Sequence, residues 1–492
     1  MLIIKRFLVL ALSAVLALPG TPASAAIKAG GTCKTSQQNS VSKELNFVCQ
    51  KKGSKLVWVA SKAAKKTEIN PTLILKELIV PNEFNFSSGN NMKVKLSINS
   101  NTTYTKPEPE LVFKVDSGKW ELPSQEIRLK PSIKSEKIDA RNINYTADFQ
   151  IDPRMPIGKW SLEFADIKYG TNQSLKIPSR EIDLIRAFYG AKDGKAIQPI
   201  GSVEYLSFKS KTVERFVWPG KYIAFQTISK DYDPEIMGRI VYTFDKAYES
   251  YKEISGYSPS LSRQYKNLLV ITEMASDEVG CGAGCGYLGA TGIELQSGLF
   301  NRLYNGVKLH DQYEQAPFYE LGRNFWNYSK FRSVLKGDAA SAKWFDANTT
   351  GFAVFMRFLI VNINEIPGGP WDSGKGVAWN DFYSAMKNLI YKQKDESSHN
   401  FTNTFEAGLP PYAGPLSVND FWASLLFYFA PVGGEKMFAK SFLAYLSNRP
   451  PATNTATAVQ NFVDAISLTL GKSVDSDFYN TLHFGDAKAL VK

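Results

Sequence analysis

One short segment, residues 318–326, gathers side chains that could do chemistry; it reads Phe-Tyr-Glu-Leu-Gly-Arg-Asn-Phe-Trp. In a helix, Glu320 and Arg323 lie three positions apart and can form an ion pair. That pair is either purely structural or part of a site. In a catalytic site, Glu320 would act as general base, Arg323 would stabilise an oxyanion and Tyr319 would donate a proton. In a binding site, the same three side chains would recognise a carboxylate or a peptide end.

Metal chemistry has few donors in this chain. Its only histidines, His310, His399 and His483, are far apart in sequence. A catalytic zinc needs three protein donors, usually imidazole, carboxylate or thiolate, and one open position for water. The guanidinium of Arg323 repels a dication, and the neutral phenol of Tyr319 is a poor donor. We therefore expect no conventional zinc site and predict no cofactor.

The four cysteines are Cys33, Cys49, Cys281 and Cys285. They allow three pairings, of which proximity in sequence favours two local bridges. The motif Cys281-Gly-Ala-Gly-Cys285 could also be a redox or metal pair. In an exported chain with no further soft ligand nearby, a disulfide is the favoured interpretation.

The amino terminus has the pattern of an export signal over residues 1–25. Lys5 and Arg6 precede an apolar run over residues 7–18, and Ala-Ser-Ala at 23–25 suits signal peptidase. The run is shorter than the roughly 20 residues that span a bilayer, and no later segment is a better candidate. We expect a secreted, extracellular protein without a transmembrane segment once the signal is removed.

Positive charge is concentrated near the predicted mature amino terminus. The formal net charge is +11, yet residues 26–66 hold nine lysines against Glu44 alone, which leaves the remaining body near neutral. A basic appendage outside the cell favours anionic cell-envelope polymers or lipid head groups as partners over nucleic acid. The alternative is a solvated lysine-rich spacer without a specific ligand.

Length and composition predict a folded protein of several domains. A chain of 492 residues suggests two or three domains, and 44% hydrophobic with 21% charged residues excludes a disordered chain. Residues 26–66 predict short strands clipped by one disulfide, followed by a linker. Residues 71–187 alternate polar and apolar side chains between turn signals, which predicts an immunoglobulin-like β-sandwich. This sandwich serves as an accessory spacer or exposes aromatic rings that bind glycans.

Residues 195–485 predict an α+β domain with a mainly helical carboxyl-terminal half. Strands are expected at 203–208, 222–228, 267–272 and 286–296, the last rich in glycine. Helices are expected at 234–255, 315–330, 352–364, 381–392, 418–429, 435–446 and 456–470. The helix at 315–330 would carry Tyr319, Arg323 and Trp326 on one face, which makes Trp326 a further binding candidate. Aromatic residues in such a stripe more often belong to a core.

Two parts of the chain resemble known families. The basic module, with its Cys33, Cys49 and Leu-Val-Trp at 56–58, resembles a small module near the amino terminus of secreted bacterial proteins. The order helix, strand, glycine-rich strand, helix within 195–485 is similar to that of zincin metallopeptidases. The segment Tyr-Glu-Leu-Gly-Arg at 319–323 resembles the His-Glu-Leu-Gly-His motif of gluzincins and enhancin-like enzymes. Tyr319 and Arg323 replace its two histidines.

The gluzincin resemblance implies a cleft in which a peptide adds to the glycine-rich strand. It also implies that Thr350, in Thr-Gly-Phe-Ala, stands where the third zinc ligand, a glutamate, would be. The expected function is therefore that of a pseudo-peptidase of the cell envelope, which binds peptide or glycopeptide through Tyr319, Arg323, Thr350 and Trp326. Two alternatives remain: a hydrolase that uses Glu320 without zinc, and a cell-wall adhesin that acts through the basic segment and the sandwich.

Overall fold

A computed structural model describes residues 28–34, 36, 39–42, 45–61, 72–100, 111–115, 125–137, 142–169, 173–334, 343–371 and 376–491. Its contacts divide the chain into two compact units, Met1–Asn70 and Pro71–Lys492. The predicted export signal, residues 1–25, lies outside the described residues. Among the described residues, no helix has both the length and the apolar character needed to cross a membrane.

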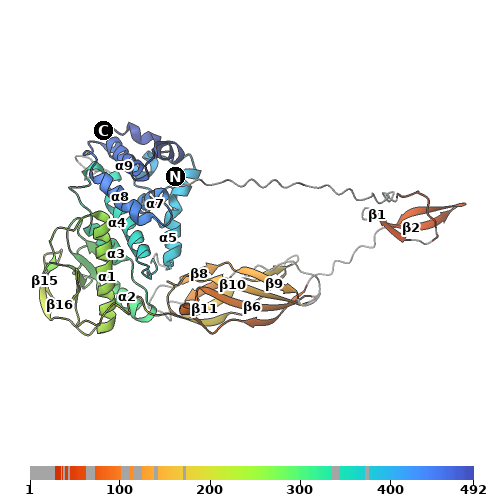
Figure 1. The fold of residues 1–492 in the computed structure, drawn as a ribbon, viewed down its shortest axis with the longest axis horizontal. Coiled ribbons are helices and arrows are strands. Elements are labelled where there is room, and N and C mark those ends of the chain that lie inside the picture. The colour runs from red at the N-terminus through yellow and green to blue at the C-terminus, as the bar shows by residue number, and fades with distance from the viewer. Residues whose placement is uncertain are drawn as a thin grey trace, which may run out of the picture. The chain divides into compact units, whose positions relative to one another are not determined.

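The first unit is a small antiparallel sheet held by a disulfide. Its three strands lie in chain order, β1 (Asn39–Ser42), β2 (Leu45–Lys52) and β3 (Lys55–Ser61) (Figure 1). The core consists of Phe47, Cys49 and Trp58, and Cys49 is bonded to Cys33. So small a core buries little apolar surface, so the bridge contributes an important share of its stability.

The second unit begins with two antiparallel sheets packed into a sandwich. One sheet has the order β4 (Leu73–Ile79), β6 (Asn91–Ser100), β10 (Asn142–Gln150), β9 (Ser132–Lys137). The other has the order β5 (Glu83–Asn85), β14 (Arg180–Ile185), β11 (Gly158–Phe164), β7 (Leu111–Val115), β8 (Gln125–Leu129), with β5 parallel to β14. A hairpin of β12 (Ile167–Tyr169) and β13 (Gln173–Leu175) lies outside both sheets.

Period-two alternation explains why these segments form a sandwich. On β6, Met92, Val94 and Leu96 are buried while Lys93 and Lys95 are exposed. Apolar side chains of both sheets meet in one core cluster that contains Val94, Phe113 and Trp160. This core is distinct from the core of the helical part of the unit. The expectation of a β-rich amino-terminal part is confirmed.

A seven-stranded mixed sheet follows. Its order is β15 (Ser202–Leu206), β16 (Thr212–Pro219), β17 (Ile223–Thr227), β19 (Leu268–Met274), β21 (Ile293–Gln296), β20 (Gly284–Gly286), and β18 (Gln264–Tyr265) also pairs with β19. Strands β17, β19 and β21 are parallel, and β20 is antiparallel at one edge. Helix α1 (Pro234–Ser255) connects β17 to β19, capped by Asp233 at its start and by left-handed Gly256 at its end.

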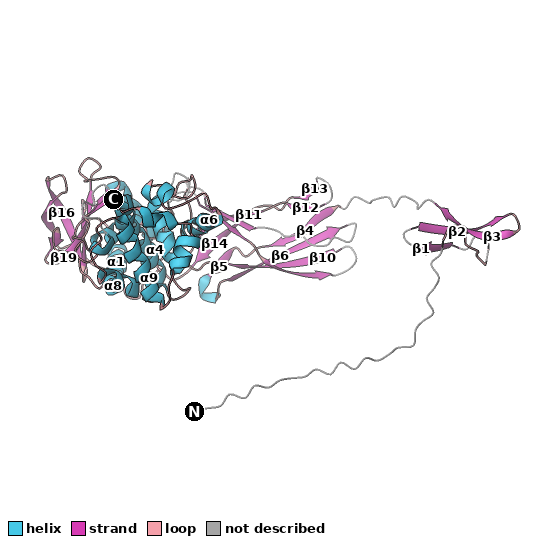
Figure 2. Ribbon diagram, turned by 90° about the horizontal axis from the view of Figure 1, so that it is seen from above, coloured by secondary structure: helices cyan, strands magenta, loops and turns pink. Residues whose placement is uncertain are grey.

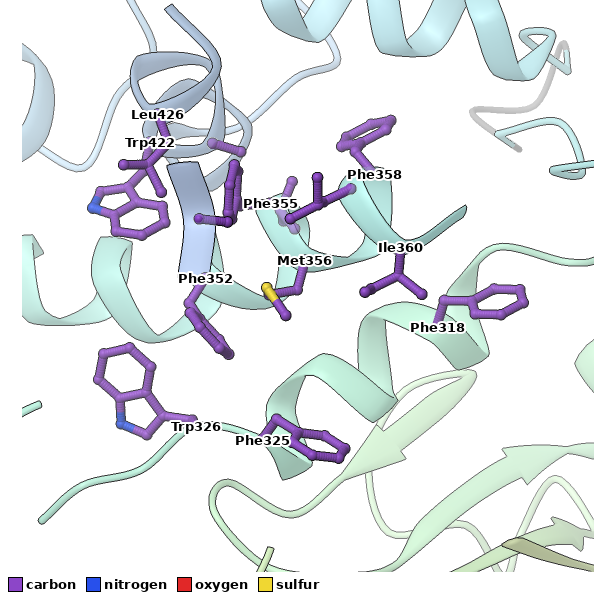
Figure 3. Packing of buried hydrophobic residues seen from close by; sticks show 14 of the residues in the cluster. Phe318, Phe325, Trp326, Phe352, Phe355, Met356, Phe358, Ile360, Trp422 and Leu426 are labelled. Atoms are coloured by element: carbon purple, nitrogen blue, oxygen red, sulfur yellow. The ribbon is translucent and has the colours of Figure 1, made fainter. Parts of the chain in front are cut away.

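The rest of the unit is mainly helical (Figure 2). Its helices are α2 (Ser297–His310), α3 (Ala316–Asn324), α4 (Lys343–Ile363), α5 (Trp379–Lys387), α6 (Leu389–Asp395), α7 (Val418–Phe429), α8 (Glu435–Ser447) and α9 (Thr455–Leu470). Every residue of α4 from 351 to 361 is buried, so this helix is the centre of the core. Figure 3 shows its side chains between those of α3 and α7. The expectation of a helical carboxyl-terminal half is confirmed.

Three predicted elements differ from the observed ones. The helix predicted at 315–330 ends at Asn324, the helix predicted at 381–392 is divided at Asn388, and the single strand predicted at 286–296 is a hairpin of β20 and β21. Gly289 and Gly292 in the connection have φ of 72° and 124°. These angles favour glycine and turn the chain back on itself.

Buried polar contacts join the sandwich to the helical part within the second unit. Arg186, which follows β14, forms an ion pair with the fully buried Asp311 at 3.0 Å. Arg154 donates hydrogen bonds to Asn362 and Asn380 at 3.2 and 3.0 Å. Because removal of one partner leaves a buried charge uncompensated, these contacts fix how the two parts meet.

Packing at Gly351 gives a test of the core. A Cβ at this position would lie 2.8 Å from Cβ of the buried Trp422 on α7, which cannot move aside. We predict that Gly351→Ala lowers the free energy of unfolding by about 1–2 kcal/mol, despite the higher helix propensity of alanine. Gly298 in α2 meets no atom within 4 Å, so Gly298→Ala is the matched control. Equal denaturant midpoints for the two variants would contradict the α4–α7 packing.

Candidate functional site

The candidate site lies where α3 meets the hairpin of β20 and β21. The last turn of α3 is fixed to the hairpin connection, because the amide of Asn324 donates to Tyr287 O at 2.8 Å and the N–H of Gly289 donates to Arg323 O at 3.0 Å. On the opposite side, the hydroxyl of Tyr251 on α1 donates to Phe318 O at 2.6 Å. These bonds hold α3 beside the free edge of the sheet.

Strand β20 presents two glycines to α3. The N–H of Tyr287 donates to Gly292 O and the N–H of Gln296 donates to Ala283 O. The main-chain N–H and C=O groups of residues 283 and 287 therefore point towards β21. Bonding alternates along an antiparallel pair, and Gly284 and Gly286 therefore direct their main-chain groups away from β21. Helix α3 packs on one face of this strand, because a Cβ at Gly284 or Gly286 would meet Glu320.

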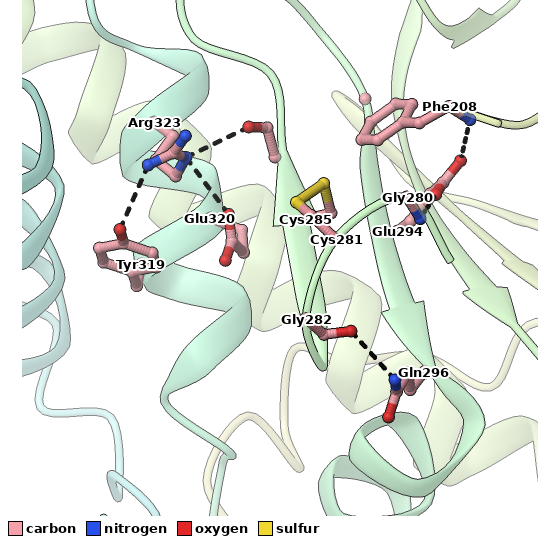
Figure 4. The surroundings of a disulfide bond; sticks show 12 residues. Phe208, Gly280, Cys281, Gly282, Cys285, Glu294, Gln296, Tyr319, Glu320 and Arg323 are labelled. Atoms are coloured by element: carbon pink, nitrogen blue, oxygen red, sulfur yellow. Dashed lines mark hydrogen bonds and ion pairs between the residues drawn. A yellow bond between two sulfur atoms is a disulfide. The ribbon is translucent and has the colours of Figure 1, made fainter. Parts of the chain in front are cut away.

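Arg323 links the helix to that edge (Figure 4). Its Nε donates to Gly286 O at 3.2 Å and its Nη1 donates to Tyr319 Oη at 3.3 Å. The same Nε lies 3.6 Å from Glu320 Oε2. The Glu320 side chain is 8% exposed and that of Arg323 is 25% exposed, so the carboxylate is enclosed while part of the Arg323 side chain reaches solvent.

Glycine at position 286 is required by the close approach of Glu320. A Cβ there would lie 2.8 Å from Glu320 O and 2.9 Å from Glu320 Oε2. At Gly284, a Cβ would lie 3.4 Å from Glu320 Oε1, a tight contact. The glycine-rich character of this strand is thus explained by the carboxylate packed against it.

A second arginine, from helix α4, also lies close to Tyr319. Arg357 of α4 is buried; its Nη1 donates to Gln315 Oε1 at 2.6 Å, and its Nη2 lies 3.7 Å from Asp420 Oδ1. The Tyr319 ring lies 5.7 Å from the guanidinium of Arg357 and 5.9 Å from that of Arg323. Both distances fit cation–π attraction. Sequence reasoning missed Arg357, although a lone arginine inside an apolar helix is a signal of a buried partner.

The electrostatics of the cluster centre on Glu320. Burial raises the pKa of Glu320 to about 7, and this rise is opposed by the charge of Arg323, by a hydrogen bond from the Gly286 N–H and by the charge of Arg357. Burial likewise raises the pKa of Tyr319. At neutral pH the site therefore holds two guanidinium groups and a carboxyl group that is roughly half protonated.

Among the described residues, no side-chain hydrogen bond joins the predicted site residues Trp326 and Thr350 to this cluster. Trp326 follows the end of α3, is 2% exposed and packs 5.0 Å from Phe331 and 5.4 Å from Phe352, so the prediction that it shares a face with Tyr319 and Arg323 is wrong. The helix ends because its last turn bonds to the hairpin. Thr350 is half-buried in α4.

The donor set does not fit a zinc ion. The side chains of Arg323 and Tyr319 bond to each other beside Glu320, and neither is a usual zinc ligand. His310, the last residue of α2, contacts Ile157 O, and His483 contacts Lys394 O. Across the described ranges, no group of three or more His, Cys, Asp or Glu side chains could hold a metal ion.

A disulfide joins the loop before β20 to the middle of that strand. Cys281 and Cys285 are bonded, with Cα atoms 5.3 Å apart, and Cys285 is the middle residue of the strand. The other bridge joins Cys33 to Cys49, so both bridges are those that proximity in sequence favours. Figure 4 shows strand β20 between the Cys281–Cys285 bridge and the Glu320 side chain. The bridge restrains the strand that carries Gly284 and Gly286.

A separate cavity of about 670 Å³ lies between the sandwich and the helical part of the same unit. It is lined by Asp152, Arg154, Arg186, Tyr189 and Asn362 among others. The arginines there already bond to protein groups, as described above. No sequence motif indicated this cavity, because its walls come from segments more than 200 residues apart.

Comparisons with known proteins add little to this geometry. No family model and no curated protein matches the sequence. One similar solved structure is AggA, the major subunit of aggregative adherence fimbriae type I from Escherichia coli. It is 11% identical, with a TM-score of 0.14 over 24% of this chain and 96% of that chain. A likeness at this score carries no argument, so the functional conclusion depends on the site itself.

The raised pKa of Glu320 predicts a pH-dependent stability. The folded state holds this proton up to about pH 7, whereas the unfolded state releases it near 4.5, so the contribution to stability is complete below pH 4.5 and is lost as pH rises towards 7. We predict that Glu320→Gln removes this dependence. Relative to wild type, the variant should become more stable by up to about 3 kcal/mol between pH 5 and pH 8.

Urea unfolding at several pH values measures this effect. Glu204→Gln, at an exposed position on β15, is the control and should keep the wild-type profile. Parallel profiles for wild type and Glu320→Gln would show that Glu320 does not titrate in this range.

Proposed function

We propose that residues 195–485 form a zincin-like domain in which the Arg323 guanidinium replaces the metal, and that this domain binds peptide or glycopeptide without hydrolysing it. Support comes from the presence of a mixed sheet with an antiparallel, glycine-rich edge strand and of a helix that bears Glu320, although β21 and α2 lie between that strand and α3 in the chain. In a peptidase of this type the edge strand lines the cleft, and an extended peptide can add to it.

The position of Arg323 is the observation that carries this proposal. Its guanidinium lies between the edge strand and the helix, bonded to Gly286 and Tyr319 and next to Glu320. A permanent cation there excludes a dication, and its solvent-exposed part can bind an anionic group of a ligand. We propose binding without hydrolysis because Glu320 is the one group of the cluster that could activate a nucleophile, and it is already paired with Arg323.

A metal-free hydrolase is the second candidate function. The specific support is the pKa of about 7 for Glu320, which suits a general acid or base at neutral pH. Peptide hydrolysis that persists in chelator and disappears in Glu320→Gln would favour this alternative over simple binding.

The sandwich over residues 71–187 is proposed to be immunoglobulin-like. Labelled in chain order, its sheets have the orders A-B-E-D and A′-G-F-C-C′, with the short A′ strand parallel to the last strand. This arrangement matches the two sheets of the immunoglobulin fold. We propose an accessory role for this domain, because its contacts with the helical part are polar and rigid.

The basic module is proposed to hold the protein at the cell envelope. Lys51, Lys52 and Lys55 are exposed at and beside the turn between β2 and β3. Two disulfides fit a protein of an oxidising compartment outside the cytosol. An extracellular protein with an exposed lysine cluster can associate with anionic wall polymers.

Restoring histidines tests the zincin-like geometry. We predict that the triple variant Tyr319→His, Arg323→His, Thr350→Glu binds about one zinc ion per chain, because two histidines four residues apart on a helix provide a metal pair. The wild-type protein and the single variant Tyr319→His should bind none. Metal analysis after dialysis measures the stoichiometry. No zinc in a folded triple variant would contradict the resemblance.

Salt dependence tests the envelope association. We predict that binding of the full chain to purified cell wall falls steeply between about 0.05 and 0.5 M salt, because exposed charges are screened. Replacing the three module lysines by glutamine should weaken the binding at low salt. A control variant replaces three exposed lysines of the second unit, Lys192, Lys230 and Lys252. Equal losses in both variants would contradict a specific role of the module.

A further inference from the structure

We infer that the edge of β20 beside Arg323 recognises the carboxyl terminus of a peptide and not the middle of a chain. The inference rests on the proposed function, since it specifies which part of a peptide binds at this edge. It depends on which main-chain groups of β20 are available and on the charges beside them.

The edge of the sheet is blocked at Gly286. Its carbonyl accepts a hydrogen bond from Arg323, and the Glu320 carboxyl group packs so closely that a Cβ at Gly286 would lie 2.9 Å from Glu320 Oε2. A peptide strand that ran past this position would need this carbonyl for pairing. It would also have to displace a guanidinium that is held by Tyr319 and Glu320.

The edge is open at Gly284. Its main-chain groups point away from β21, and no hydrogen bond joins them to another segment among the described residues. Gly284 is half-buried, and the two residues before it, Gly282 and Ala283, are exposed. A peptide can therefore pair with Gly284 and must end before or at Gly286.

The charges of the site favour the carboxyl end of a peptide over its amino end. Arg323 and Arg357 contribute two positive charges around Tyr319, and the nearby acidic groups are Glu320 and Asp420. Arg357 is buried and lies beside Asp420, and the Glu320 side chain is only 8% exposed, so the charge that an incoming ligand meets is that of the 25% exposed Arg323. A terminal carboxylate would be attracted to this charge, whereas a terminal ammonium would be repelled by it.

The distances fit such a ligand. One strand residue spans about 3.3 Å, so Gly284 and Gly286 are about 7 Å apart along the edge. A peptide residue opposite Gly284 would place a carboxylate one or two residues later beside the exposed part of Arg323. The planar guanidinium can then bind both carboxylate oxygens.

The test compares two pools of mixed-sequence hexapeptides that differ only at the carboxyl end, one with free acids and one with carboxamides. Both pools are acetylated at the amino end and labelled, and binding to the full chain is measured by fluorescence anisotropy. We expect the acid pool to bind at least about tenfold more tightly, the effect of a charge-assisted hydrogen bond. In Arg323→Gln, the two pools should bind equally.

The controls separate the two levels of the proposal. Lys308→Gln, at an exposed position on α2, should keep the preference for the acid pool. If Arg323→Gln does not fold, Arg323→Lys keeps the charge without the planar fork and should reduce the preference. Equal binding of both pools to wild type would overturn the carboxyl-terminal inference alone. Binding of neither pool would overturn the proposed peptide-binding function.

Discussion

One guanidinium ties helix α3 to the open edge of the seven-stranded sheet, and the geometry of the site depends on this contact. The carbonyl of Gly286 would otherwise face a buried carboxylate across a narrow gap. Arg323 supplies a donor to the carbonyl and a positive charge to Glu320 at the same time. Enclosing a carboxylate costs several kcal/mol, so such a group persists only where a cation and hydrogen-bond donors compensate it.

The same requirement explains the residues around the pair. Glycines at 284 and 286 leave room for the Glu320 side chain. Tyr319 separates two guanidinium groups that would repel each other, and its aromatic face is attracted to both. Asp420, in the first turn of α7, lies beside Arg357, so its negative charge compensates that of a buried guanidinium in the helical core. Strand, helix and core are thereby coupled through a few polar side chains.

Sequence periodicity predicts the regular elements well and the site only in part. The boundaries of α1 and α7 follow from capping residues and apolar spacing. The alternation of polar and apolar side chains along β6 is visible in its sequence. The ion pair of Glu320 and Arg323 is a local feature, so helical spacing indicates it. Trp326 was misplaced because the end of α3 is set by hydrogen bonds from Asn324 and Gly289 to other segments. Arg357 joins the cluster through tertiary contacts that no local pattern contains.

The bridge between Cys281 and Cys285 closes a ring of only five residues. By chain entropy, a ring this small stabilises the whole fold by about 2 kcal/mol, less than the longer ring between Cys33 and Cys49. Its main effect is local, on a strand of three residues that would otherwise fray. Protein made in a reducing compartment would therefore fold but would lack an ordered strand β20. Formation of this one bridge would then determine the fraction of molecules with an ordered β20, independently of how many molecules are produced.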